Sequence, residues 1–247
     1  MKHKARIAEA SIHNFPEQPK RKLKLRIDDL SVFDPLTKNQ SIFFDTYKQG
    51  AKAMMLHGAA GTGKTFIALY KALEEVMDKG NPYQKVVLVR SVVPSREIGH
   101  LPGDEKEKTD VYLAPYKATC QHLFNTDQAY ERLVEQKNIE FMITSFVRGI
   151  TIDNAVIIVD ECQNMNFQEL SSIITRVGEN TKIIFCGDFK QTDLCKKHDQ
   201  SGLRDFVEII KHMPSFRSIE FGIDDIVRSD LVKEFIVANL HIQTIKS

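Results

Sequence analysis

The sequence predicts an α/β fold, with a mostly parallel β-sheet covered by helices on both faces. Short apolar runs alternate with longer stretches of helical periodicity along most of the 247 residues. The run from Ala155 to Asp160 is apolar up to its last residue, as expected of a strand that is covered on both faces. Alternating strands and helices favour parallel pairing, because each helix returns the chain to the starting edge of the sheet. Ligands bind to such sheets at the carboxyl ends of the strands.

The pattern predicts six strands and seven helices. The strands are expected at Ala53–His57, Val86–Arg90, Ile139–Thr144, Ala155–Asp160, Lys182–Cys186 and Ser218–Phe221. The helices are expected at Asn39–Lys48, Thr65–Asp78, 111–124, 126–137, Phe167–Val177, Gly202–His212 and Ser229–Leu240. We expect Ser229 to cap the last helix, because a serine hydroxyl can accept from the free N–H groups of the first turn.

A basic extension over residues 1–33 is expected to precede a single domain over residues 34–247. The extension is polar, contains two prolines, and is expected to be irregular. Five cations stand between Lys20 and Arg26, where apolar and charged residues alternate up to Ile27. This alternation predicts a solvated edge strand. A nucleic-acid-binding patch is the alternative interpretation of the same charges.

The composition indicates an ordinary globular protein with one core. Hydrophobic residues make up 42% and charged residues 27% of the chain. A net charge of +1 supplies no overall field for a polyanion, so nucleic-acid binding would need a local basic surface. The cysteines form no C-x-x-C pair, which indicates reduced thiols in a cytoplasmic protein. We expect no secretory signal and no membrane span, because no apolar run is long enough.

A glycine-rich turn between an expected strand and an expected helix predicts a triphosphate site. The turn matches G-x-x-x-x-G-K-S/T at every fixed position; its residues are Gly58, Ala59, Ala60, Gly61, Thr62, Gly63, Lys64 and Thr65. Glycines let several backbone N–H groups point inward, and the helix N-terminus adds to this concave anion site. We expect Lys64 to reach the β- and γ-phosphates of ATP, and the Thr65 hydroxyl to bind Mg²⁺. The pattern therefore predicts a P-loop NTPase.

Two adjacent carboxylates follow the apolar run at 155–160. In P-loop enzymes an aspartate at the place of Asp160 holds Mg²⁺, often through water. A neighbouring glutamate, here Glu161, suits the general base that orients the attacking water. A solvated acidic turn after a strand is the alternative interpretation.

Two glutamines are expected near the nucleotide. The run from Cys186 to Gln191 resembles the third motif of superfamily-one helicases, which implies that Gln191 senses the γ-phosphate. Gln40 precedes the strand that leads into the glycine-rich turn, and its amide can bond an adenine edge as both donor and acceptor. Superfamily-one proteins carry such a glutamine.

Together these motifs resemble the PhoH family of phosphate-starvation ATPases, from about residue 37 to 238. The resemblance is carried by GAAGTGKT at 58–65, Leu101–Asp104 with Lys108, Pro115–Tyr116, Val147–Gly149 with Thr151, Asp160–Asn164, Thr175–Arg176, Gly187–Asp188 with Gln191 and Asp193, Ser201–Leu203, and Asp225–Arg228. It implies a single RecA-like P-loop core that hydrolyses ATP with Mg²⁺ and acts on RNA or single-stranded nucleic acid, like a helicase. Short members occur in bacteriophages, so the host cytoplasm is one expected location.

The chain departs from the family pattern in three places. Cys162 stands where alanine is usual, and Ile150 stands where a second arginine is usual. The segment at 90–94 lacks the usual Arg-Pro opening.

A single core poses a problem for catalysis. In helicases of this kind, a second core supplies an arginine finger, which is worth roughly 10³–10⁵ in rate. We expect a neighbouring subunit in a homo-oligomeric ring to supply it here, with Arg228 as first candidate and Arg148 and Arg176 behind it. Nucleic acid is expected to contact the segment Ser91–Lys108 through Arg96, His100, Lys106 and Lys108, although a polar surface loop is the plainer interpretation.

Three other functions compete with an ATPase that acts on nucleic acid. A module that uses ATP only to assemble subunits would need no turnover. A small-molecule kinase is disfavoured by the acidic pair, which suits water activation. A GTPase is disfavoured because the guanine-reading N/T-K-x-D motif is missing.

Overall fold

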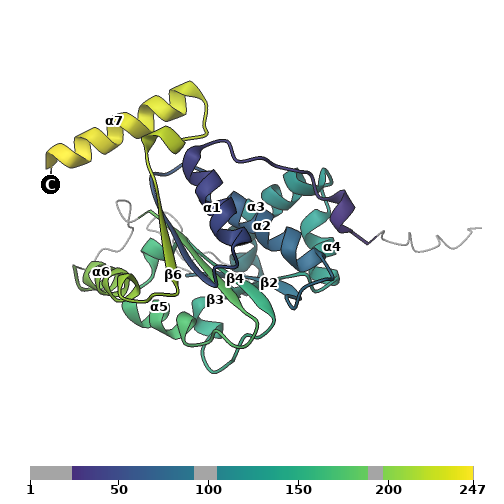
Figure 1. Ribbon diagram of the computed structural model, residues 1–247. Coiled ribbons are helices and arrows are strands. Elements are labelled where there is room, and N and C mark those ends of the chain that lie inside the picture. Colours follow the sequence, from purple (N-terminus) through teal and green to yellow (C-terminus); the bar gives the residue numbers. More distant parts are fainter. Residues whose placement is uncertain (1–23, 92–104, 189–196, 247) are drawn as a thin grey trace, which may run out of the picture.

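A six-stranded sheet forms the centre of the molecule (Figure 1). The computed structural model describes residues 24–91, 105–188 and 197–246. The strand order is β3-β2-β4-β5-β1-β6, and every pairing is parallel, which confirms the predicted α/β fold. The strands are β1 (Ala53–Gly58), β2 (Lys85–Arg90), β3 (Ile139–Ile143), β4 (Ala155–Asp160), β5 (Lys182–Gly187) and β6 (Phe216–Phe221).

Helices cover both faces of this sheet. One face carries α1 (Lys38–Lys48), α2 (Lys64–Met77), α3 (Glu105–Phe124) and α4 (Ala129–Glu135), and the other carries α5 (Phe167–Ile174) and α6 (Lys197–Lys211). Along β1, Met54 and Leu56 enter the first core and Met55 enters the second, because successive side chains of a strand point to opposite faces. Within the described ranges, no helix is long and apolar enough to cross a membrane.

The last helix, α7 (Asp230–Lys246), lies apart from both layers, at the yellow end of the chain in Figure 1. Ile236, Val237 and Leu240 pack against Ala59 and Ile226. α7 therefore covers the glycine-rich turn that follows β1. The helix starts one residue after Ser229, and the Lys233 N–H donates to the Ser229 carbonyl (2.9 Å).

Most helices and strands differ from the prediction only by residues at their ends, and α5 is shorter than predicted. Helical periodicity extended this helix to Val177, whereas the structure ends it at Ile174. Val177 instead forms a parallel bridge with Ile152, and the Ile152 N–H donates to the Arg176 carbonyl (2.8 Å). A tertiary backbone contact therefore replaces the last helical turn.

The prediction of an edge strand before residue 28 is wrong for residues 24–27, the part of that stretch that the structure describes. Residues 24–26 have no regular structure, and Ile27–Asp29 form a 3-10 helix. The Gln136 side chain bonds both the N–H and the carbonyl of Leu25 (2.8 and 2.9 Å), so an amide takes the place of a neighbouring strand. Leu25 and Leu30 are buried in the main core. The division at residues 33 and 34 stays a prediction, although residues 24–33 already pack on the domain.

An ionic cluster around the buried Lys182 lies at the amino-terminal edge of the sheet. The Lys182 ammonium contacts both carboxylate oxygens of Glu75 (2.6 and 2.8 Å), and the Tyr47 hydroxyl donates to Glu75 Oε2 (2.5 Å). The cluster ties α1 and α2 to the start of β5, at the opposite end of the strands from the glycine-rich turn. Buried charges are tolerated when they are paired and hydrogen-bonded in this way.

Candidate active site

The carboxyl ends of the parallel strands meet at one edge of the sheet. β1 runs into the phosphate loop, Gly58–Thr65, while β4 ends at Asp160 and β5 is followed by Asp188. Arg90 at the end of β2 lies opposite Asp160 in the strand register. The structure thus gathers the motifs that sequence analysis had located separately.

Close contact with β6 fixes the start of the phosphate loop. Gly58 has a φ of 110°, and a Cβ at that position would lie 2.2 Å from the Phe221 carbonyl oxygen. The Ala59 N–H donates to the same oxygen (2.9 Å). Only glycine fits between these strands at this backbone conformation.

Lys64 is folded back into the loop that precedes it. Its ammonium donates to the carbonyls of Gly58 (3.0 Å) and Ala59 (2.7 Å), and the residue is only 9% exposed. Burial lowers the pKa of the Lys64 amine, and nearby carboxylates led by Asp188 partly offset this. A buried cation surrounded by carbonyl oxygens is well placed to exchange them for the oxygens of an anion.

Asp160 is held from two sides. The Thr65 hydroxyl donates to Asp160 Oδ1 (2.6 Å), and the Tyr116 hydroxyl donates to Asp160 Oδ2 (2.7 Å). Asp160 is buried, which rules out the alternative of a solvated acidic turn. Tyr116 is 1% exposed, and burial followed by the charge of Asp160 raises its pKa well above the ordinary value. The phenol therefore stays protonated and donates to the carboxylate.

Glu161 directly precedes a 3-10 helix, Cys162–Asn164, and adopts a left-handed conformation with a φ of 51°. Non-glycine residues rarely adopt this conformation, and such strain clusters at functional sites. The Gln163 amide donates to Glu161 Oε2 (2.5 Å), and Gln163 Oε1 accepts from the Asp188 N–H (3.1 Å). Burial and then the charge of Asp160 raise the pKa of Glu161, which suits a group that accepts a proton.

Gln40 braces the phosphate loop from α1. Its Nε2 donates to the Thr62 carbonyl (3.0 Å), and its Oε1 accepts from the Leu36 N–H (2.8 Å). At 3% exposed, the amide is committed to its own chain at both ends. Its contact with an adenine edge stays a prediction, but the structure does place it beside the loop.

Arg228 lies against the phosphate loop of its own chain. A Cβ added to Gly61, whose φ is 74°, would lie 3.0 Å from Arg228 Cγ, and the Val227 N–H donates to the Gly61 carbonyl (3.0 Å). Arg228 is exposed at this position, which also suits contact with the nucleotide of its own chain. Its assignment as a finger for a neighbouring subunit stays a prediction.

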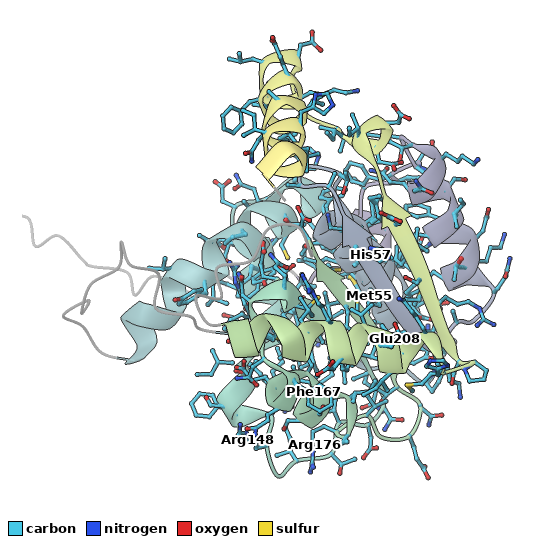
Figure 2. The ribbon with its side chains drawn as sticks, turned by 90° about the vertical axis from the view of Figure 1, so that its left-hand side faces the viewer. Met55, His57, Arg148, Phe167, Arg176 and Glu208 are labelled. Atoms are coloured by element: carbon cyan, nitrogen blue, oxygen red, sulfur yellow. The ribbon has the colours of Figure 1, made fainter. Side chains whose placement is uncertain are left out.

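The other two arginine candidates lie far from α7. Figure 2 shows Arg148 and Arg176 together at the lower end of the molecule, while the yellow helix that covers the phosphate loop stands at the top. Arg148 is exposed and Arg176 is half-buried. Neither reaches the phosphate loop of its own chain.

Several predicted residues lie outside the described part of the chain. These are Gln191, Arg96, His100 and Cys195, and the side chains of Lys106 and Lys108. The three described cysteines are buried free thiols, in agreement with the predicted reduced state (Cys120, Cys162 and Cys186). Burial raises the pKa of the Cys120 thiol to about 12, so this cysteine is unreactive.

Sequence reasoning assigned no role to Tyr116, Gln163 or Arg90, although all three contact or flank the acidic pair. Pro115–Tyr116 was noted only as part of a family pattern. A tyrosine within an amphipathic helix is normally a core residue, so its partner on a distant strand could not be inferred. The signal for Arg90 was its place at a strand end, where ligand sites form.

The PhoH-like protein family model matches residues 32–239. The chain belongs to the PhoH family. A PhoH-like protein of Bacillus subtilis is 38% identical over 182 residues, which cover 73% of this chain and 56% of the relative. Protein PhoH of Escherichia coli is 35% identical over 176 residues, which cover 70% and 49%. The chain thus spans about half the length of these PhoH relatives.

Among solved structures, a large terminase from a thermophilic bacteriophage, in complex with ADP, is similar over 81% of this chain and 49% of that one. The sequence identity is 14% and the TM-score is 0.46. The family match, the phosphate-loop motif and the all-parallel sheet identify the PhoH-family chain as a P-loop protein with a RecA-like fold.

The turn that carries Arg228 is anchored by Asp225, and this anchor is testable by pH. Asp225 Oδ2 accepts from Asn39 Nδ2 (2.7 Å) and from the Gly222 N–H (2.8 Å). Burial alone would raise the pKa of Asp225, but side-chain hydrogen bonds from Thr37 and Asn39 reverse this and lower it.

We predict that Asp225→Asn lowers the free energy of unfolding at pH 7 by about 1–3 kcal/mol, the range for a hydrogen-bonded charge. The pKa of Asp225 is depressed in the folded protein. Its charge therefore stabilises the fold fully above the ordinary pKa of 3.8, and this stabilisation is lost as the pH falls through the folded pKa. Urea unfolding at several pH values measures both quantities. The exposed neighbour provides the control, since Asp224→Asn should change little. A deficit that stays constant into acid would contradict this role of the charge.

Proposed function

We propose that this PhoH-family chain binds ATP with Mg²⁺ and hydrolyses it, and that hydrolysis is coupled to RNA or single-stranded nucleic acid. One observation carries the hydrolysis: the Thr65 hydroxyl and the Asp160 carboxylate are 2.6 Å apart at the phosphate loop, with Glu161 next in the chain. A hydroxyl, a metal-binding carboxylate and a base at one loop are the parts that phosphoryl transfer to water requires.

The donor set fits magnesium. Mg²⁺ prefers oxygen ligands, and in nucleotide sites it takes one or two from the protein and others from phosphates and water. Thr65 and Asp160 would hold it, and the ion would offset the charge of the phosphate oxygens. Within the described residues, no group of three or more His, Cys, Asp or Glu side chains could hold a metal by itself. The proposed site needs none, because the nucleotide completes it.

Lys64 and the loop would bind the phosphates. The Lys64 ammonium would exchange the carbonyls of Gly58 and Ala59 for phosphate oxygens, while the N–H groups at the start of α2 face the same anion. Arg228, beside Gly61, adds a second cation from the same chain. Gln40 would contact the adenine edge by exchanging one of its present hydrogen bonds, to the Thr62 carbonyl or from the Leu36 N–H.

Glu161 would orient and deprotonate the attacking water. Its carboxylate is fixed by the Gln163 amide, which holds one of its oxygens and orients the group. Gln163 also accepts from the Asp188 N–H, so the position of Glu161 depends on the segment that follows β5. Gln191, three residues further, is proposed to sense the γ-phosphate through that segment.

A head-to-tail ring would complete the site. Arg148 is exposed at the lower end of Figure 2, away from the helix α7 that packs against Ala59 of the phosphate loop. A head-to-tail ring would bring this end toward the phosphate loop of a neighbouring subunit. Exposed apolar side chains accompany both surfaces: Leu231 and Phe235 on α7 are 77% and 70% exposed, and Phe146 beside Arg148 is 63% exposed. Such surfaces favour contact between copies, and head-to-tail contacts close into rings.

The nucleic-acid part of the proposal rests on the family resemblance and on the basic residues of Ser91–Lys108. The alternative is a PhoH-like module that binds ATP and assembles without turnover. Intact Lys64, Thr65, Asp160 and Glu161 favour hydrolysis over this alternative.

Phosphate release from ATP, with and without RNA or single-stranded DNA, tests the proposal. We expect turnover that nucleic acid stimulates, with the stimulation lost at high salt. Lys64→Ala should abolish ATP binding with an unchanged circular dichroism spectrum. Glu161→Gln should retain ATP binding and lose turnover by roughly 10²–10⁴-fold, the usual contribution of a general base. Negligible hydrolysis that Glu161→Gln leaves unchanged would favour the assembly module.

Mixing two inactive variants tests the ring. Arg148→Ala should lower turnover by about 10³-fold or more, as loss of an arginine finger does. Adding Lys64→Ala protein should restore part of it, because each intact loop then meets an intact Arg148 from its neighbour. Arg228→Ala is the matched control and should not be rescued, since its arginine serves its own loop. Mixed oligomers that form without regaining activity would exclude Arg148 as the shared residue.

A further inference from the structure

Asp160 receives hydrogen bonds from two elements that are separate in the sequence. Thr65 is the last residue of the phosphate loop and lies in the first turn of α2, whereas Tyr116 lies in the middle of α3. The two hydroxyls occupy different carboxylate oxygens, at 2.6 Å for Oδ1 and 2.7 Å for Oδ2. Asp160 is therefore held between α2 and α3, from a different carboxylate oxygen on each side.

We propose that Tyr116 is a positioning residue for the metal site, which keeps Asp160 Oδ1 turned toward Thr65 by holding Oδ2. This role rests on the proposed function, because it assigns Thr65 and Asp160 to the metal. The torsion that turns a carboxylate is broad and has no strong preference of its own. One hydrogen bond leaves the group free to swing about its partner, whereas two bonds from opposite sides fix its plane.

The position of Tyr116 is itself fixed by packing. Tyr116 is 1% exposed, and its ring lies 5.9 Å from that of Phe141 on β3. One turn earlier on α3, Tyr112 lies under the guanidinium of Arg90 at 5.6 Å. Arg90 pairs in register with Asp160, so α3 contacts the ends of both β2 and β4. A shift of α3 would therefore move the carboxylate that faces the metal.

A simpler role for Tyr116 would be structural, since every buried hydroxyl needs a partner. Tyr47 provides a matched comparison. It is also buried and also donates to a carboxylate, Glu75 Oε2 (2.5 Å), but at the other edge of the sheet. A purely structural role predicts the same kind of effect for both tyrosines, namely a loss of stability.

The test is the Mg²⁺ dependence of ATP binding, followed with a fluorescent ATP analogue and without turnover. In Tyr116→Phe, we expect the Mg²⁺ concentration at half-saturation to rise by roughly 10–100-fold, the usual cost of losing a group that orients a metal ligand. Binding of the analogue without Mg²⁺ should not change. Tyr47→Phe should lose stability in urea and keep the wild-type Mg²⁺ midpoint.

An unchanged midpoint in folded Tyr116→Phe would overturn the positioning role and leave the proposed function intact. Wild-type binding that shows no Mg²⁺ dependence would overturn the metal site itself. If Tyr116→Phe does not fold, Tyr116→His, which keeps an N–H donor, is compared with Tyr116→Met, which has none. A lower Mg²⁺ midpoint for Tyr116→His than for Tyr116→Met supports the positioning role, and equal midpoints for the two variants overturn it.

Discussion

The hydrogen bond between Thr65 and Asp160 is the contact on which the proposed chemistry depends. It joins residues 95 positions apart and sets the distance between the phosphate loop and the acidic pair. The parallel sheet makes this contact possible, because it brings the carboxyl ends of β1 and β4 to one edge with only β5 between them. The close approach of Gly58 to Phe221 fixes the loop on its other side. The loop is thus held at its start by packing against β6 and at its end by the hydrogen bond to Asp160 of β4.

This arrangement concentrates buried charge at one edge of the sheet. Lys64, Asp160 and Asp188 are all buried there, and Glu161 is only partly exposed. Burial shifts the pKa of Lys64 downward and that of Glu161 upward, so each charge is less stable than it would be in water. Perturbed groups of opposite sign in one place are typical of active sites. A doubly charged cation and a triphosphate would offset these charges.

The sequence predicted the fold and the principal motifs because each depended on local pattern. Apolar runs gave the strands nearly to the residue, and fixed spacing gave the loop from Gly58 to Thr65. Predictions failed where a partner distant in the sequence decides the outcome. Gln136 bonds the backbone of Leu25 where a strand was predicted, and Val177 leaves its predicted helix to pair with Ile152. The hydrogen bond from Tyr116 to Asp160 belongs to the same class, because no local pattern shows which buried carboxylate a core tyrosine will meet.

A crystal structure with a non-hydrolysable ATP analogue and Mn²⁺, located by its anomalous scattering, tests the central claim most directly. We predict that the triphosphate lies in the loop at 58–65 and that the metal contacts the Thr65 hydroxyl oxygen on the side facing Asp160. A metal bound away from both residues, with the analogue well ordered, would contradict the account.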